Sequence, residues 1–466
     1  MKNDNGLLAA LEQYSGTEAY PLHMPGHKRN VDMLGSELPY SIDITEINGF
    51  DDLHDPRDIL RELSEKCRKI YRADSAFLLV NGSTCGILAA ISSVTHRGDS
   101  IIIARNCHRS VYNACALSEL DVRFVYPPMD KNGLCGSLPA ESVAAALGEC
   151  PSAKAVVITS PTYEGVLSNI ELIASVCRRN KTALIVDAAH GAHLPFCSFG
   201  KKYNPNEAGA DIVITSLHKT LPSMTQTAAA FVNGNIVSRE RFAAMLGVFE
   251  TSSPSYVLLS SIDRCLDFII SNRDSFGKYE EMLKGFSQSA RELKNLKILC
   301  AGTDNAKRHG FFAFDKGKIV ILTSHTNITG TQLMRRLRDE FSLELEMAYP
   351  TYALAMTSVC DSPEGISRLS DALLRIDKTL LPVKNPPAFP PLPKPMRIRM
   401  TNREIDSLPD IELTRNQAES GRYISRKSIF SYPPGIPIIT PGEIVGTFEY
   451  DYIEMLRGSG VSIKEV

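Results

Sequence analysis

The sequence lacks the features that mark nucleic-acid-binding, membrane-spanning or disulfide-stabilised proteins. Its formal net charge is only -2, so it has no basic excess to match a phosphate backbone. No apolar run approaches the length of a membrane span, and the first five residues lack the apolar core of a secretory leader. The 11 cysteines are scattered without a CxxC pair, which favours reduced thiols. We therefore expect a cytoplasmic globular protein.

Apolar runs of strand length alternate with helix-like segments between residues 59 and 215. The expected strands are 76–80, 101–104, 122–126, 155–159, 183–186 and 212–215. The expected helices are 59–71, 85–94, 111–120, 140–148 and 171–179. This alternation predicts a parallel α/β sheet that is covered by helices on both faces.

The rest of the chain divides by composition and pattern. Residues 1–60 read as an arm with a short helix over 7–14, and 61–300 as the large domain, ending in long helices at 256–272 and 275–295. A smaller α/β domain is expected over 301–381, with strands at 311–314 and 319–322 and helices at 330–341 and 363–379. A stiff proline-rich linker, 382–395, leads to an end piece, 396–466.

A lysine follows the last strand of the predicted large sheet. The strand 212–215 runs into Ser216-Leu-His-Lys219. Open α/β sheets bind ligands at this position, where a partly desolvated lysine has a lowered pKa and can form a Schiff base with a carbonyl. Taken alone, Lys219 is more simply a surface lysine. Its assignment therefore depends on the residues at the other strand ends.

A possible phosphate site follows the first strand. The sequence Asn-Gly-Ser-Thr at 81–84 opens directly into a helix, where Gly82 lets a ligand approach the backbone and Ser83 and Thr84 offer hydroxyls. Ser216 adds another hydroxyl. The same four residues also make a good helix N-cap, so the motif is weak alone.

Two other strand ends carry a histidine and an acid. His108 could lie flat on a planar ring, or could be a surface histidine before a helix. Asp187 closes a buried run, where a carboxylate is costly unless a cation pairs with it. A protonated pyridine nitrogen is one such cation. A metal held with His190 and His193 is another, although their order fits no standard zinc motif.

These four features together fit one ligand, pyridoxal 5′-phosphate (PLP). A phosphate cradle, a stacking imidazole, a buried acid and a Schiff-base lysine follow one another along the chain. Each has an ordinary explanation alone, but their joint occurrence favours PLP.

The sequence also resembles a known family, the Orn/Lys/Arg decarboxylases of fold type I, in the short form that lacks the N-terminal wing domain. The motifs that carry the resemblance are His-Met-Pro-Gly-His-Lys (23–28), Asp-Ile-Thr-Glu (43–46), Asp-Asp-Leu-His (51–54), Asn-Gly-Ser-Thr (81–84), Asn-Cys-His-Arg-Ser (106–110), Asp-Ala-Ala-His-Gly-Ala-His (187–193), Ser-Leu-His-Lys-Thr (216–220), Thr-Ser-Ser-Pro-Ser-Tyr (251–256) and Tyr-Pro-Pro-Gly-Ile-Pro…Pro-Gly-Glu (432–443). They span nearly the whole chain in family order. The sequence departs from the short-form pattern at Ala188, where glutamate is common.

The resemblance implies a fold and a set of residue roles. The fold would be an aspartate aminotransferase-like large domain with a mostly parallel seven-stranded sheet, plus a smaller α/β domain. Lys219 would bind PLP, Asp187 would hold the pyridinium proton, and His108 would stack on the ring. The residues at or near the cofactor would also include Ser83, Thr84, His190, Ser216 and His218. Thr251 would reach the phosphate of the neighbouring subunit's PLP, which makes a homodimer the smallest working unit.

The implied reaction is decarboxylation of arginine, lysine or ornithine to agmatine, cadaverine or putrescine. Lys219 or His108 would return a proton to Cα, and Glu443 is a candidate partner for the substrate's distal cation, although a solvated glutamate on a turn explains it equally well. The alternatives are another fold type I enzyme, such as an aminotransferase or lyase, and a PLP-holding regulator without turnover. The sequence does not choose among the three substrates or fix the assembly above the dimer.

Overall fold

The computed structural model describes residues 6–17, 39–300 and 306–466. The motif at 23–28 lies outside the described residues. A short helix, α1 (Leu7–Ser15), is anchored to the body because Asp263 Oδ2 accepts a hydrogen bond of 2.8 Å from Leu7 N. No helix in these described ranges is both long enough and apolar enough to cross a membrane.

A seven-stranded mixed sheet forms the centre of the larger unit, in the order β1-β8-β7-β6-β4-β2-β3. Its strands are β1 (Ser75–Leu79), β2 (Ser100–Ala104), β3 (Asp121–Val125), β4 (Ala155–Thr159), β6 (Ala183–Asp187), β7 (Ile212–Ser216) and β8 (Ala228–Val232). All are mutually parallel except β8, which runs antiparallel to both β1 and β7. The α/β sheet predicted from the apolar runs is confirmed, with the mostly parallel seven-stranded arrangement that the resemblance implied, and β8 is an addition to the predicted strands.

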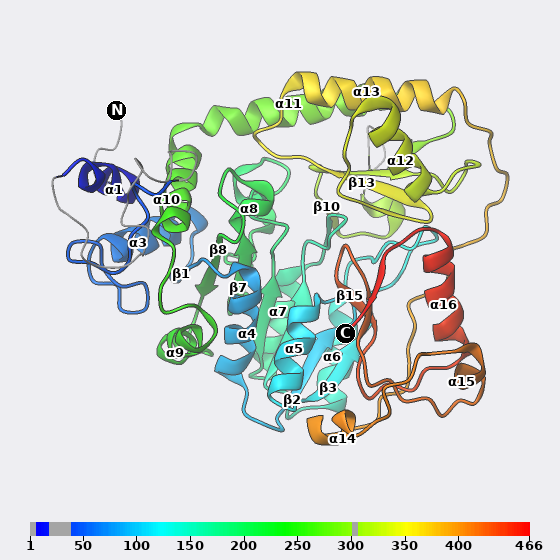
Figure 1. Ribbon diagram of the computed structural model, residues 1–466, viewed down its shortest axis with the longest axis horizontal. Coiled ribbons are helices and arrows are strands. Elements are labelled where there is room, and N and C mark those ends of the chain that lie inside the picture. The colour runs from blue at the N-terminus through cyan, green and yellow to red at the C-terminus, as the bar shows by residue number, and fades with distance from the viewer. Residues whose placement is uncertain (1–5, 18–38, 301–305) are drawn as a thin grey trace.

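Helices cover this sheet in two groups. They are α3 (Ile59–Tyr71), α4 (Gly82–Val94), α5 (Arg109–Leu117), α6 (Ala140–Glu149), α7 (Ile170–Arg179) and α9 (Arg239–Phe249). The helix α4 packs against α5 and α9, whereas α6 packs against α7. In Figure 1, α4 and α5 lie in front of the sheet. The crossovers place the carboxyl ends of the parallel strands along one edge, where ligands bind in such sheets.

Two long helices, α10 (Tyr256–Ser271) and α11 (Arg273–Ser289), lead to a smaller α/β unit. Its sheet has the order β12-β13-β11-β9, with β9 (Lys297–Ile298), β11 (Lys318–Leu322), β12 (Met347–Tyr349) and β13 (Tyr352–Met356). The helices α12 (Gly330–Phe341) and α13 (Pro363–Asp377) cover it, and α13 lies beside α11 at the top of Figure 1. This unit has an apolar core of its own.

Two predicted elements are shorter than the sequence pattern indicated. The helix predicted to reach Asn295 ends at Ser289, because the Asp377 carboxylate accepts hydrogen bonds from Lys294 N at 2.8 Å and Leu296 N at 2.7 Å. These bonds hold the backbone outside the helix. The strand predicted over 311–314 is only β10 (Ala313–Phe314), which pairs with β5 (Val166–Leu167) of the larger unit.

The C-terminal segment folds beside the edge of the large sheet (Figure 1). It contains α14 (Asn402–Asp406), α15 (Arg415–Glu419), β14 (Ile429–Ser431), β15 (Ile436–Ile439), α16 (Thr447–Gly458) and β16 (Ile463–Glu465). Its Tyr-Pro-Pro-Gly turn reaches α5, where Gly435 O accepts a hydrogen bond of 3.0 Å from Arg109 N. Gly435 has φ +80°, and a Cβ on it would lie 3.2 Å from the His108 ring. The turn therefore needs glycine there to pack against His108.

Candidate active site

Lys219 and Asp187 lie at the carboxyl ends of neighbouring parallel strands. Asp187 is the last residue of β6 and stands opposite Ile214 of β7 in the register of the sheet. The strand β7 ends at Ser216, and a single helical turn, α8 (Leu217–Thr220), carries Lys219. The two side chains are close enough for their charges to interact. The structure thus brings together the predicted lysine and acid.

The Lys219 side chain is partly buried. Its Nζ lies 3.0 Å from His190 Nε2. Burial lowers the pKa of Lys219, and the nearby carboxylates of Asp187 and Glu346 only partly oppose this. The pKa of His190 falls well below its ordinary value because the ring is buried and faces lysine charges, so His190 is neutral. A lysine in such surroundings is suited to nucleophilic attack on a carbonyl.

Asp187 is a buried acid that forms no salt bridge with any residue in the described part of the chain. It is 4% exposed, and its Oδ1 accepts a hydrogen bond of 3.1 Å from Ala189 N. Burial raises the pKa of Asp187, although the Lys219 charge opposes this. A buried carboxylate that forms no ion pair with any described residue is costly unless a ligand supplies the cation. A protonated ring nitrogen fits this requirement.

The predicted phosphate cradle lies where β1 passes into α4. Gly82 has φ +73°, and Ser216 Oγ donates a hydrogen bond of 3.0 Å to Ser83 Oγ, which joins the two predicted hydroxyls. The Asn81 side chain does not cap α4, so the first backbone N–H groups of the helix are not bound by it. Thr84 is exposed at this end of the helix. The arrangement suits an anion and does not support the simple N-cap interpretation.

His108 is positioned by the start of α5. Its Nδ1 accepts a hydrogen bond of 3.2 Å from Ser110 N and lies 2.9 Å from Ser110 Oγ. Burial lowers the pKa of His108 to about 4, with smaller contributions from the Lys219 and Arg109 charges. The ring is therefore neutral at physiological pH, as a stacking partner for a cationic pyridine would be.

Two other predicted cofactor residues have protein partners. His218 Nδ1 lies 2.8 Å from Thr227 O and so donates to it, and burial lowers the pKa of His218. Thr251 Oγ1 accepts a hydrogen bond of 3.2 Å from Ser253 N, and Thr251 O lies 2.9 Å from His54 Nε2. Their contact with a phosphate stays a prediction.

The predicted partner of the substrate's distal cation, Glu443, is bound inside the protein. The Glu443 Oε2 lies 3.2 Å from Nη2 of the buried Arg105. The same Oε2 accepts a hydrogen bond of 2.7 Å from Thr440 N. Burial raises the pKa of Glu443, which the Arg105 charge opposes. The structure therefore favours a structural role for this carboxylate, because it is already paired with the Arg105 guanidinium.

Sequence reasoning missed three residues near Lys219. Lys318 begins β11 and lies 3.0 Å from His190 Nδ1, while the Tyr163 ring lies 4.4 Å from the His190 ring. Tyr163 also donates a hydrogen bond to the exposed Glu346. Lys318 and Glu346 come from the smaller unit, so their approach depends on how the two units pack. For Lys318, the only signal in the sequence was a lysine at the start of an apolar run, whereas Tyr163 lies in a turn, 160–165, that follows a predicted strand and is able to line a pocket.

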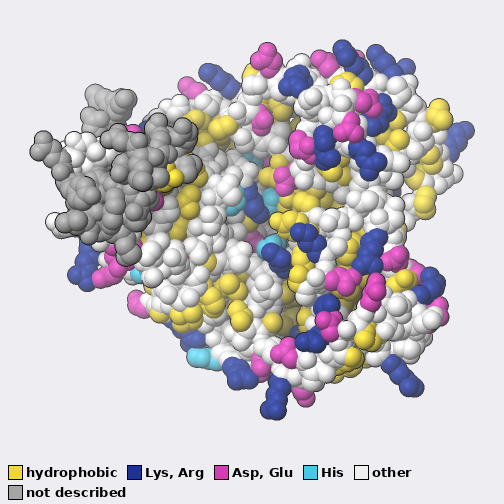
Figure 2. All heavy atoms as spheres, in the orientation of Figure 1, with side chains coloured by type: hydrophobic (Ala, Val, Ile, Leu, Met, Phe, Trp, Pro, Cys, Tyr) yellow, Lys and Arg dark blue, Asp and Glu magenta, His cyan; other side chains and the backbone are white. Residues whose placement is uncertain are grey.

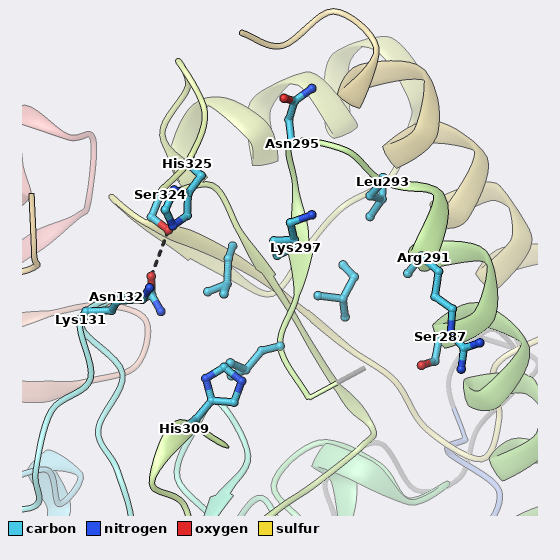
Figure 3. A pocket seen from close by; sticks show the side chains of 14 residues that line it. Lys131, Asn132, Ser287, Arg291, Leu293, Asn295, Lys297, His309, Ser324 and His325 are labelled. Atoms are coloured by element: carbon cyan, nitrogen blue, oxygen red, sulfur yellow. Dashed lines mark hydrogen bonds between the residues drawn. The ribbon is translucent and has the colours of Figure 1, made fainter. Parts of the chain in front are cut away.

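Within the described residues, no group of three His, Cys, Asp or Glu side chains could hold a metal ion. A hollow of about 360 Å³ is lined by Lys131, Lys297, His309 and His325 among others, with Ser324 bound to Asn132 at 3.0 Å (Figure 3). None of the predicted site residues lines it. On the face in Figure 2, acidic and basic side chains are mixed, and histidines appear in a central hollow.

The sheet order, the lysine after β7 and the acid at the end of β6 define the fold of the PLP-dependent enzymes of fold type I. Solved structures agree. The constitutive lysine decarboxylase of E. coli superposes with a TM-score of 0.81 at 17% identity, covering 98% of this chain and 79% of that one. Sphingomonas wittichii serine palmitoyltransferase gives a TM-score of 0.57 at 16% identity, covering 81% of this chain and 86% of that one.

The chain belongs to the Orn/Lys/Arg decarboxylase family, since the major domain of that family matches residues 5–298. An arginine decarboxylase of Bacillus subtilis (strain 168) is 29% identical over 99% of this chain and 96% of its own length. The inducible lysine decarboxylase of Escherichia coli (strain K12) is 23% identical over 90% of this chain and 70% of its own. The chain is thus a decarboxylase of the basic amino-acid class, as the resemblance predicted.

Proposed function

We propose that this protein uses PLP to remove the α-carboxylate of a basic amino acid, with arginine as the first candidate substrate. The observation that carries the proposal is the placement of Lys219 and Asp187 at adjacent strand ends, each partly or fully dehydrated. Arginine comes first because the B. subtilis arginine decarboxylase matches along nearly the whole chain. When bound, PLP supplies the electron sink that takes up the electrons left by CO2.

The chain's own residues would each do one task. The Lys219 amine would hold PLP covalently and, when free, would protonate the substrate at Cα, with His108 as the other candidate for that proton. Asp187 would keep the ring nitrogen protonated, and the neutral His108 ring would cover one face of the cofactor. Ser83 and Ser216 would bind the phosphate. Thr84, His190 and His218 would complete the cofactor surroundings.

Recognition of the substrate's distal cation is assigned to Glu346 in place of Glu443. Glu346 is exposed and accepts a hydrogen bond from Tyr163, which packs on His190. Its charge acts on both Lys219 and Lys318, so it lies near the site. A carboxylate that is exposed and close to the reacting lysine can bind an incoming guanidinium or ammonium group.

The proposed working unit is a homodimer, in which Thr251 contributes to the neighbouring subunit's phosphate site. Mixing a Lys219→Ala chain with a Thr251→Ala chain tests this. If sites are shared, the mixture regains part of the wild-type activity, because one site in a mixed dimer has both intact residues. No recovery in a mixture shown to contain mixed dimers would contradict the shared site.

The test of the proposed function is an amine-product assay. The full chain with PLP is given arginine, lysine and ornithine separately, and products are identified by mass spectrometry. We expect agmatine from arginine, complete loss with Lys219→Ala, and no loss with Lys316→Ala, which removes an exposed lysine. Aldehyde exchange without CO2 release would contradict the proposal and favour an aminotransferase. Cofactor binding without any turnover would favour a regulator.

A further inference from the structure

His190 lies between two lysine amines, one from each unit of the protein. Its Nε2 lies 3.0 Å from Lys219 Nζ and its Nδ1 lies 3.0 Å from Lys318 Nζ. His190 is 6% exposed and Lys318 is 2% exposed. Lys318 forms no ion pair with any residue in the described ranges, and a buried ammonium without one is costly. Its position therefore calls for an explanation beyond packing.

When both hydrogen bonds are intact and His190 is neutral, at most one of the two lysines can be an ammonium. A neutral imidazole has one N–H donor and one acceptor nitrogen, and an ammonium group donates only. If Lys318 is the ammonium, it donates to Nδ1, and Nε2–H must then face a neutral amine on Lys219. If Lys219 is the ammonium instead, Nδ1–H must face a neutral Lys318. His190 therefore couples the charge states of the two lysines.

The surrounding charges favour the ammonium on Lys318. The charged and titratable groups that act on these three residues are Asp187, Glu346, Asp315, Glu164, His108 and His218. Asp315 and Glu164 act on Lys318, whereas Asp187 acts on Lys219. Because Asp187 is the group assigned to the cofactor's ring nitrogen, its charge is not available to hold a proton on Lys219 in the loaded enzyme. Asp315 keeps its effect on Lys318 in every state.

We propose that Lys318 carries the shared proton and, hydrogen-bonded to His190, keeps Lys219 a neutral amine. This rests on the proposed function, in which Lys219 is the amine that binds PLP. Lys318 is a positioning residue in this proposal, because its amine is hydrogen-bonded to His190 and acts on Lys219 through its charge. Burial lowers the pKa of Lys318 to about 8, which still leaves it an ammonium at neutral pH.

The test measures the pH dependence of Lys219 reactivity in the full-length protein without PLP. Reductive methylation at a series of pH values, followed by peptide mass spectrometry, gives the midpoint for Lys219. Lys318→Met should raise this midpoint by about one pH unit or more, and so lower Lys219 labelling about tenfold at pH values below both midpoints, because a cation about two hydrogen bonds away is lost. Lys318→Arg should keep the wild-type midpoint. Lys316→Met is the matched control at an exposed lysine of the same turn.

The outcomes separate this charge coupling from the proposed function. An unchanged Lys219 midpoint in Lys318→Met would overturn the coupling, even if activity fell. If that variant does not fold, Lys318→Gln replaces it, with a shift in the same direction expected and an unchanged midpoint again contradicting the coupling. If the wild-type enzyme carries PLP on a lysine other than Lys219, the proposed function fails instead.

Discussion

Two buried carboxylates in this protein, Asp187 and Glu443, were both assigned to the site from sequence, but their surroundings differ. Glu443 pairs with Arg105 at 3.2 Å inside the fold, whereas Asp187 forms no ion pair with any described residue. Burial raises the pKa of both. An acid whose cation is built into the chain stabilises the fold. An acid that lacks one is poised to bind a cationic ligand.

The largest effect is expected on stability at Glu443. Glu443→Gln should lower the free energy of unfolding by about 3–5 kcal/mol, because Arg105 would be left buried without its counter-charge. Urea unfolding measures this. Below the unfolding transition, the variant should keep the kcat of the wild type. Loss of kcat in a folded Glu443→Gln protein would show that this acid does act on the substrate.

The effect at Asp187 should fall on catalysis instead. Asp187→Asn should lower amine formation about 10²–10³-fold, as expected for removal of an electrostatic partner in a water-excluded site. The variant should fold, with Lys219 and its neighbours in the same positions as in the wild type. Steady-state kinetics with saturating PLP measures the loss, and a decrease of less than about threefold would argue against a ring-nitrogen partner at this position.

A third acid, Glu346, sharpens the comparison because it is exposed. Glu346→Gln should raise KM for arginine about tenfold with a smaller change in kcat, since one charge-assisted contact to the substrate would be lost. The matched control is Glu344→Gln, an exposed acid two residues away that pairs with Arg338. If both variants have the same KM as the wild type, distal recognition lies elsewhere.

The smallest effect concerns the stability of the protein without PLP. The folded-state pKa of Asp187 lies above its unfolded value, so the folded chain binds a proton more tightly, and the associated stability is lost as pH rises through the folded pKa. Asp187→Asn should therefore raise the stability of the PLP-free protein at pH 7 by about 1 kcal/mol, with the gain shrinking toward pH 4. Thermal unfolding at both pH values checks this. A gain that grows at low pH would contradict a raised pKa of Asp187 in the folded state.

The sequence predicted the large sheet well because buried parallel strands are continuous apolar runs. It missed β8, whose Ala-Ala-Ala-Phe-Val sequence has little β-branched character. It also placed Lys219 and Asp187 correctly at strand ends, since both follow such runs directly. The division into arm, domains, linker and end piece stays a prediction.

The remaining site residues depend on packing between segments far apart in the chain. Lys318 and Glu346 reach Lys219 only because the smaller unit packs on the larger one. Glu443 looked accessible as part of a Pro-Gly-Glu turn, and only the fold shows Arg105 beside it. Periodicity describes which face of an element is buried. It does not show which distant side chain meets it there.

The most direct test of the central claim is to identify the lysine that carries PLP. The holoenzyme is reduced with borohydride, digested, and the phosphopyridoxyl peptide is sequenced by mass spectrometry. We predict the label on Lys219, in the peptide that follows β7. A label on Lys318 or any other lysine, with Lys219 unmodified, would contradict the account of this site.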